Sequence, residues 1–273
     1  MDDEMVIGLD PHKASNTIAV MDRTEQVIAR GRFRNDDAGI AEMVDAVAEH
    51  TSRVWAVEGA NGIGRHVAQR LVAAGEVVVD VPAKLATRVR VYSTGHGTKT
   101  DDTDAVAIAR AAIHSRQLRR VQPDGPAVAM KLLSDRRREL VGARTQAACR
   151  LHRMLRELIP GGAPKQLTAE AASDLLNRVD ATGAADMMRV EVARDHIDDI
   201  ARLDRKIDDY TKRITSQVKA VDTTVTRIFG IGPLNAAMII GDVGDVSRFP
   251  TRDHFASYTG TAPIAVSSGD HHR

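Results

Sequence analysis

Near the start of the chain stands the stretch Val6-Ile7-Gly8-Leu9-Asp10, followed by Pro11. Its leading residues are apolar, which predicts a short buried strand. Because proline cannot donate to a strand ladder, regular pairing is expected to end at Pro11. The carboxylate of Asp10 is therefore predicted to lie at the end of a central strand, exposed at the rim of a sheet.

Around this stretch, β-rich segments alternate with segments of helical spacing. The expected elements are strands at 6–10, 17–22 and 26–33, a helix at 38–50, a strand at 54–57, a helix at 64–74 and a strand at 77–81. Three strands separated by polar breaks suit an antiparallel meander, and the later alternation suits α/β crossovers. The order predicts an α/β domain of the ribonuclease-H-like class, with a mixed sheet covered by helices.

The rest of the chain is expected to be mostly helical. Residues 82–98 are basic and glycine-containing with little periodicity, which predicts a loop bordering the sheet. Helices are expected at 100–112 and 127–158, and the Pro/Gly cluster at 159–164 predicts a turn between helices. The sequence thus divides into an α/β domain at 1–118, a helical connector at 119–219 and a small helical C-terminal domain at 220–273.

A heptad-like seam runs through the helical connector. Apolar residues recur every three or four positions, at Ile200, Leu203, Ile207, Tyr210 and Ile214. This spacing predicts coiled-coil-like packing. Because the seam covers only about two heptads, dimerisation of two chains and packing within one chain's helical hairpin remain open as equal alternatives.

The C-terminal domain contains a glycine turn between two predicted helices. Residues 226–237 suggest a helix, a tight turn at Gly230 and Gly232, and a second helix that begins at Pro233, a helix-hairpin-helix pattern. Such a turn presents backbone N–H groups to a nucleic-acid phosphate. An ordinary packed helical hairpin explains the same residues equally well.

Composition excludes several classes of protein. Of the 273 residues, 43% are apolar and 3% aromatic, which allows aliphatic cores and excludes a disordered chain. The formal net charge is +1, so any nucleic-acid contact must rest on local clusters. The acidic start and the lack of a long apolar run predict a cytoplasmic protein with no signal peptide or membrane span. Cys149 is the single cysteine, which excludes an internal disulfide and a cysteine-based zinc site.

Three further acids extend the pattern that Asp10 begins. Glu58 follows the apolar residues 54–57 and precedes Gly59, so a second strand end carries a carboxylate near a turn. Asp101 and Asp104 stand three residues apart at the start of a predicted helix and share one face of it. The four carboxylates are expected to converge at one edge of the sheet.

Four carboxylates in one cleft repel each other unless protons or divalent cations neutralise them. Magnesium takes oxygen ligands, and paired magnesium ions suit phosphoryl transfer. The pattern therefore predicts a Mg²⁺ site, with Mn²⁺ as an alternative. Taken singly, each acid has a simpler explanation, as a turn residue for Asp10 and Glu58 or as a first-turn helix residue for Asp101 and Asp104.

The same residues resemble a known family. The stretches that carry the resemblance are Ile7-Gly8-Leu9-Asp10-Pro11-His12-Lys13, Val57-Glu58-Gly59 and Lys99-Thr100-Asp101-Asp102-Thr103-Asp104-Ala105. They resemble the DEDD insertion-sequence transposases of the IS110 family, whose catalytic domain is similar to the Holliday-junction resolvase RuvC. The motifs at 228–233, 247–249, 258–260 and 262–269 resemble that family's C-terminal transposase domain. The resemblance spans essentially the whole chain.

The resemblance implies a transposase that cleaves and exchanges DNA strands. It implies that Asp10, Glu58, Asp101 and Asp104 bind the metal, and that Ser268 is a nucleophile that becomes linked to DNA, with the adjacent Ser267 as the alternative. It also implies three partners: DNA, a structured bridge RNA that pairs with donor and target DNA, and further copies of the chain in a dimer or tetramer.

A basic helix suits such partners. Arginines outnumber acids between residues 131 and 157, and Arg136, Arg137 and Arg144 are candidate phosphate contacts. A solvated helix face is the competing explanation. The sequence stops at Arg273, whereas members of the family continue, so the C-terminal domain is expected to be truncated.

Two rival functions compete with this prediction. An actin-like ATPase also begins with a strand that ends in Asp, but Pro11-His12-Lys13 stands where such an enzyme needs a glycine-rich phosphate turn. The other rival is a non-catalytic, nucleic-acid-binding remnant of a transposase, carried by the basic helix and the glycine turn.

Overall fold

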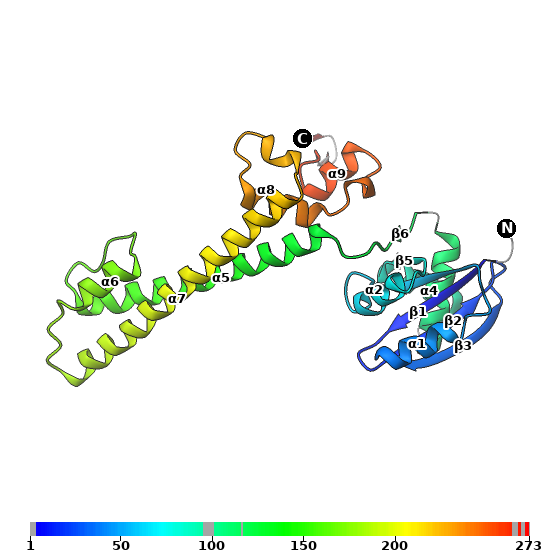
Figure 1. Cartoon of the computed structure of the whole chain (residues 1–273), viewed down its shortest axis with the longest axis horizontal. Coiled ribbons are helices and arrows are strands. Elements are labelled where there is room, and N and C mark those ends of the chain that lie inside the picture. The colour runs from blue at the N-terminus through cyan, green and yellow to red at the C-terminus, as the bar shows by residue number, and fades with distance from the viewer. Residues whose placement is uncertain (1–3, 95–100, 116, 264–266, 269–270, 273) are drawn as a thin grey trace. The chain divides into compact units, whose positions relative to one another are not determined.

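The structure is a computed structural model that describes residues 4–94, 101–115, 117–263, 267–268 and 271–272. The chain forms two compact units, Met1–Asp124 and Gly125–Arg273 (Figure 1). The first unit is an α/β domain and the second is mainly helical. Within the described residues, no helix combines the length and the apolarity that a membrane span requires.

The first unit is built on a six-stranded sheet. Its strands are β1 (Met5–Pro11), β2 (Ser15–Met21), β3 (Val27–Arg34), β4 (Arg53–Glu58), β5 (Val78–Val81) and β6 (Arg119–Arg120). The order is β3-β2-β1-β4-β5-β6, with β1, β2 and β3 antiparallel, β1, β4 and β5 parallel, and β6 antiparallel to β5. The predicted mixed α/β sheet is confirmed.

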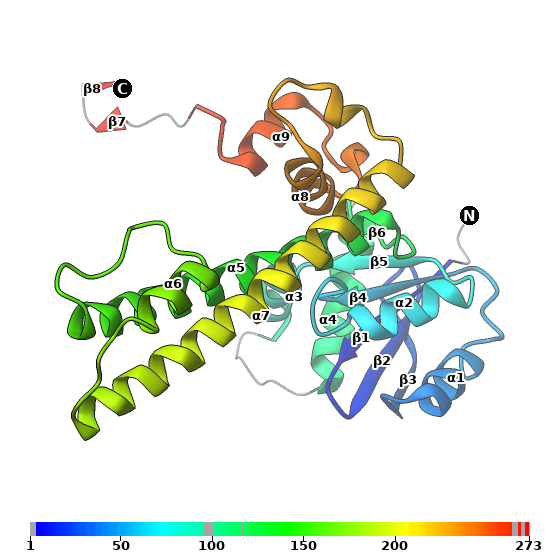
Figure 2. The same ribbon diagram turned by 60° about the vertical axis from the view of Figure 1, so that its left-hand side comes forward.

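Helices cover both faces of the sheet (Figure 2). On one face, α1 (Asp37–Asp45) and α2 (Arg65–Ala73) pack against Ile7, Leu9 and their neighbours. On the other face, α3 (Ala83–Thr94) and α4 (Asp101–His114) pack against Val6 and neighbouring residues. Because successive strand residues point to opposite faces, residues 6, 8 and 10 of β1 lie on the α3/α4 side.

The prediction of a loop between the last parallel strand and the next helix is wrong. The stretch 82–98 was expected to be a loop, but residues 83–94 of it form α3. Pro82 precedes the first residue of this helix, and Leu85, Ala86 and Val89 pack into the core below the sheet. Leu85 and Ala86 lie one helical turn before Val89, and their packing against the sheet stabilises the helix although the segment also carries basic residues.

A partly buried carboxylate, Glu76, connects β4 to the end of the α2–β5 connection. Glu76 accepts hydrogen bonds from Arg53 Nε at 2.9 Å and from Trp55 Nε1 at 2.8 Å, and the Trp55 side chain is completely buried. Burial raises the pKa of Glu76, but hydrogen bonds from Arg53 and Trp55 and the charge of Arg53 lower it by more, so this pKa lies below its ordinary value. Glu76 therefore satisfies the only polar group of the largest core side chain.

Two long helices form the frame of the second unit. They are α5 (Pro126–Leu158) and α7 (Ala184–Ala220), and α6 (Ala169–Leu176) packs against both near one end. The side-chain contacts Arg137–Thr211, Arg144–Asp204 and Glu157–Arg189 show that the helices run antiparallel.

The heptad-like seam packs within this helix pair. Ile200, Leu203 and Ile214 are buried between α7 and its neighbours in the same chain. Of the two alternatives that the sequence left open, the structure shows the intramolecular one for these positions.

The second unit continues in shorter elements after α7. These are η1 (Thr224–Arg227), α8 (Pro233–Val243), η2 (Val246–Arg248), α9 (Arg252–Thr259) and the paired strands β7 (Ser267–Ser268) and β8 (His271–His272). The first helix of the predicted helix-hairpin-helix is only a 3-10 turn, η1. The positive φ of +83° at Gly230 ends helical geometry there, and the residues between it and the end of α7 at Ala220 contain only this 3-10 turn.

Candidate active site

Two of the predicted acids stand at the ends of neighbouring parallel strands. In the β1–β4 pairing, Leu9 lies opposite Val57, so Asp10 and Glu58 are the next residues along their strands. Asp10 is only 5% exposed. Since Gly8 faces α4 and side chains alternate, Asp10 lies on that face too. Sheet pairing therefore brings the first two carboxylates to one edge.

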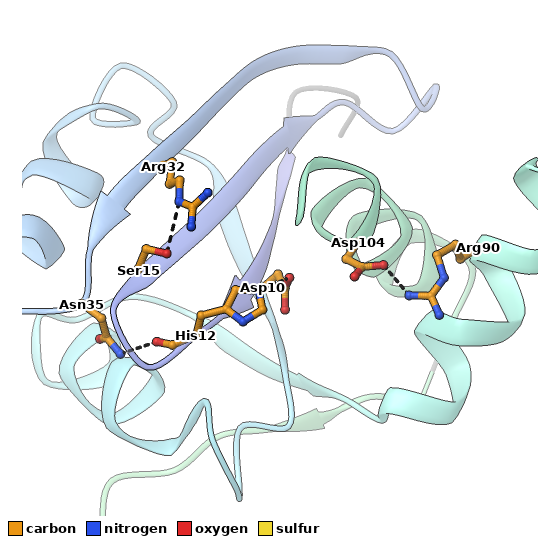
Figure 3. Close-up of polar contacts among 7 residues, drawn as sticks. All are labelled: Asp10, His12, Ser15, Arg32, Asn35, Arg90 and Asp104. Carbon is orange, nitrogen blue, oxygen red and sulfur yellow. Dashed lines mark hydrogen bonds and ion pairs between the residues drawn. The ribbon is translucent and has the colours of Figure 1, made fainter. Parts of the chain in front are cut away.

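A close helix–strand contact brings the third acid to the same edge. A Cβ added to Gly8 would lie 2.1 Å from the Ala105 carbonyl oxygen and 2.6 Å from the Ala109 backbone nitrogen. Only glycine permits this approach of α4 to β1. Asp104 precedes Ala105 on α4 and is 6% exposed. Figure 3 shows Asp10 at the end of β1 and Asp104 across from it on α4.

Each of these two buried acids has a basic partner. His12 Nε2 lies 3.0 Å from Asp10 Oδ2. Arg90 of α3 forms an ion pair with Asp104, and both contacts are visible in Figure 3 as neighbouring side chains. The backbone of His12 is fixed by its N–H, which donates to the Ser15 carbonyl at 2.8 Å. These partners limit the orientations that the two carboxylates can adopt.

Sequence reasoning did not identify His12 or Arg90 as site residues. His12 stands in the quoted motif two residues after Asp10, and that spacing was the available signal. Arg90 gave no signal, because its segment was predicted to be a loop rather than the helix that turns it toward Asp104.

The remaining acids are placed less completely. Glu58 is the last residue of β4 and is partly buried. Asp101 is the first residue of α4, but its side chain lies outside the described residues. Asp102 is exposed. Among the side chains that the structure describes, no three His, Cys, Asp or Glu groups are grouped closely enough to hold a metal ion.

The chemistry of the edge nevertheless suits a hard cation. Its charged donors are carboxylate oxygens, the ligands that Mg²⁺ prefers. Thr17 lies directly opposite Asp10 on β2, and its hydroxyl is buried without a hydrogen-bond partner in the described part of the chain. A buried oxygen without a partner beside a buried carboxylate is the kind of group that a metal ion with its waters would satisfy.

The predicted serine and glycines lie in the second unit. Ser268 and its neighbour Ser267 form β7, and their side chains lie outside the described residues. Gly230 has the positive φ of a tight turn, and Gly232 is the N-cap of α8. Pro233 is the first residue of that helix, as the sequence predicted.

The candidate phosphate-binding arginines of α5 all have contacts within the second unit. Arg136 Nη1 lies 2.7 Å from Glu139 Oε2, and Arg137 Nε donates to Thr211 Oγ1 at 2.8 Å. Arg144 donates twice to Asp204 of α7, and this hydrogen-bonded pairing raises the pKa of Arg144. The arginine with the most specific intramolecular contact is thus Arg144.

Comparison with known families gives two matches that together cover most of the chain. Residues 7–160 match a DEDD-type family described as "Transposase". Residues 222–273 match the family described as "Transposase IS116/IS110/IS902 family".

Individual proteins give a consistent picture. The chain is 24% identical over 313 residues to an uncharacterized 44.8 kDa protein of insertion element IS116 from Streptomyces clavuligerus, covering 98% of this chain and 78% of that protein. It is 31% identical over 144 residues to an uncharacterized 42 kDa protein of IS900 from Mycobacterium paratuberculosis, covering 51% of this chain and 36% of that protein. Among solved structures, RuvC of Thermus thermophilus aligns over 43% of this chain and 99% of its own, with 13% identity and a TM-score of 0.33.

Proposed function

This chain belongs to the DEDD family of IS110-type transposases, and from that premise we propose that it cleaves and exchanges DNA strands at the acidic edge of its first unit. The observation that supports the proposal is that Asp10 and Glu58 are neighbours in the β1–β4 register and that the close approach of α4 to Gly8 places Asp104 on the same edge of the sheet. Strand ends and a helix start from three separate segments supply these carboxylates. Turn or capping roles explain each acid singly but not their shared location.

The residues proposed to hold Mg²⁺, or Mn²⁺, are Asp10, Glu58, Asp101 and Asp104. When bound, such ions neutralise charge on the phosphate that reacts and stabilise the attacking and leaving oxygens. The protein itself keeps Asp10 and Asp104 almost completely buried, which excludes bulk water from their carboxylates. His12 and Arg90 orient the two carboxylates through the contacts described above.

Ser268 is the proposed nucleophile. Its Oγ gives up its proton and forms a bond to the phosphorus of the scissile phosphodiester, while the bond from phosphorus to the leaving sugar oxygen breaks and that oxygen takes up a proton. A serine hydroxyl is a weak nucleophile at neutral pH and needs activation by a neighbouring group. The acids belong to the first unit and Ser268 to the second.

The proposed partners are DNA, a bridge RNA that selects donor and target by base pairing, and further copies of this chain in a dimer or tetramer. The support for them is family membership. The N–H groups of Arg136 and Arg137 that their contacts within the second unit do not use, together with the backbone N–H groups after Gly230, are proposed to bind the phosphate backbone.

Strand exchange in a purified system tests the proposal. The full chain is mixed with bridge RNA, paired donor and target DNA, and magnesium. Recombined DNA or a covalent protein–DNA product is expected with the unmodified protein, and neither product is expected with Asp10→Ala or Ser268→Ala. Ser267→Ala is the matched control and is expected to remain active. Normal product from Ser268→Ala contradicts the nucleophile, and DNA binding without any exchange supports the non-catalytic alternative.

A second experiment tests the metal ligands without measuring activity. Magnesium is expected to raise the unfolding temperature of the unmodified protein, since it binds only the folded site. The Asp101→Ala, Asp104→Ala double variant is expected to lose this shift. Asp102→Ala is the control, because Asp102 neighbours both residues and is exposed. An unchanged magnesium shift in the double variant refutes the ligand set.

A further inference from the structure

A pocket lined by three arginines lies beside the acidic edge. It has a volume of about 200 Å³ and is formed by Arg30 of β3, Arg90 of α3 and Arg110 of α4, with Val106 and Thr103 of α4 between them. All of these elements belong to the first unit. The pocket therefore lies on the α3/α4 face of the sheet, the same face that carries Asp104.

The three guanidinium groups differ in how fully they are used. Arg30 is exposed and forms no ion pair with any described residue. Arg110 Nε lies 3.2 Å from Glu25 Oε2 as an ion pair, yet this buried nitrogen makes no hydrogen bond within the described residues. Arg90 contacts Asp104 through Nη1 (Figure 3). A guanidinium carries five N–H donors, so Arg30 leaves donor capacity in the pocket.

Acids near the pocket oppose this positive charge only in part. Asp102 lines the pocket and is exposed to solvent. Glu25 is shared between Arg110 and His114, whose Nε2 lies 2.5 Å from its carboxylate. Since Arg30 has no acidic partner in the described chain, the pocket has at least one guanidinium that is not neutralised locally.

We infer that this pocket binds a backbone phosphate of the DNA strand, a few nucleotides from the phosphate that reacts at the acids. Arginine binds phosphate oxygens through paired, charge-assisted hydrogen bonds, and the pocket brings three arginines to one concave surface. Its apolar floor of Val27, Val106 and Ala107 offers nothing that would hydrogen-bond a base edge. The contact would therefore position the strand without reading its sequence.

The position of the pocket on α4 fixes which phosphate it would hold. Arg110 follows Asp104 by six residues, which places it about 9 Å farther along the helix axis. That distance corresponds to roughly two or three nucleotides along a strand of B-form DNA. A phosphate held by Arg110 and Arg30 would thus lie about two or three nucleotides from the reacting phosphate, and holding it would position the strand against Asp10 and Asp104.

This inference rests on the proposed function, and DNA binding tests it separately from catalysis. The probe is a fluorescently labelled DNA duplex that carries the donor sequence, bound to the full chain in an Asp10→Ala background so that no strand is cleaved. The Arg30→Gln, Arg110→Gln double variant is expected to bind several-fold more weakly at low salt. The slope of log affinity against log salt concentration is expected to fall in magnitude by about 1, because one phosphate contact is lost.

Two further variants keep the outcome decisive. Arg30→Gln alone removes the exposed arginine without breaking an ion pair, so it weakens binding while leaving the unfolding temperature unchanged. Arg70→Gln is the matched control, because Arg70 pairs with exposed Asp37 on the α1/α2 face. Unchanged affinity and salt slope in the double variant overturn the pocket assignment, as does an equal loss in Arg70→Gln. If the unmodified protein shows no magnesium-dependent exchange while the pocket variants still weaken DNA binding, only the proposed chemistry is contradicted.

Discussion

Replacing Gly8 with alanine perturbs the contact that brings Asp104 to Asp10. The new Cβ would lie 2.1 Å from the Ala105 carbonyl oxygen, more than an ångström closer than the 3.4 Å at which ordinary contact begins. Both obstructing atoms nearest to it belong to backbone, so no side chain can rotate away. Helix α4 must shift outward from β1. Overpacking of this kind costs about 1–3 kcal/mol of stability, and occasionally more.

The shift has a second consequence for activity. Asp104 stands immediately before Ala105, so it moves with the helix, whereas Asp10 stays with the sheet. A displacement of about 1 Å at a reacting centre lowers the rate by roughly 100-fold. Gly8→Ala is therefore expected to remain folded with a lower free energy of unfolding, while its rate of strand exchange falls by roughly 100-fold.

Chemical denaturation and strand exchange, measured on the same preparation, test both parts. Gly142→Ala is the matched control, because Gly142 lies in the interior of α5 with open space around its Cα. That substitution is expected to stabilise the second unit by about 0.5–1 kcal/mol through its effect on backbone entropy. If Gly8→Ala unfolds at the same denaturant concentration as the unmodified protein and exchanges strands at the same rate, the close approach is not what positions Asp104.

Three further predictions concern stability. The pKa of Glu76 is lowered on folding. Its ionised form therefore stabilises the protein above about pH 4.5, and this contribution is lost as the pH falls through the folded pKa. Glu76→Gln is expected to lower the free energy of unfolding by about 1.5–3 kcal/mol at neutral pH and to flatten the pH dependence of urea unfolding in that acidic range. Arg144→Gln and Asp204→Asn are each expected to cost up to about 1 kcal/mol, since the pair is partly exposed, and weaker nucleic-acid binding in the arginine variant alone would show that Arg144 contacts a ligand instead. Ser134 has a buried hydroxyl without a partner in the described chain, so Ser134→Ala is expected to leave the unfolding midpoint unchanged or to raise it, and a clear loss of stability would reveal a hydrogen bond to this hydroxyl.

The sheet could be predicted because its local and global signals agree. Apolar runs bounded by polar breaks identified β1, β4 and β5, and their order with the intervening helices determined the class of sheet. Helix α3 could not be predicted, because its core contact depends on three apolar residues within a basic, glycine-flanked stretch. Only the sheet against which they pack makes that segment a helix. The two-residue strand β6 has no pattern of its own and exists through its pairing with β5.

The site divides in the same way. Asp10 and Glu58 could be predicted because each follows an apolar strand directly, and parallel strands that are neighbours bring their ends to one edge. The partners His12 and Arg90 depend on side-chain directions that no spacing rule supplies, and Arg90 also depends on a helix that was not predicted. Contacts between segments distant in sequence are the part of a site that a single sequence encodes least directly.

The small residues at the helix–sheet contact connect the core to the acids. The small residues Gly8, Ala105 and Ala109 let α4 lie directly on β1. Asp10 follows Gly8 by two residues, and Asp104 immediately precedes Ala105. A larger residue at any of the three positions would separate the helix from the strand and the two carboxylates with it. The same geometry carries Arg110 one residue beyond Ala109, toward the arginine pocket. Packing at one point on α4 therefore sets the positions of both the proposed metal ligands and the proposed phosphate contact, and substitutions that loosen it are expected to impair both together.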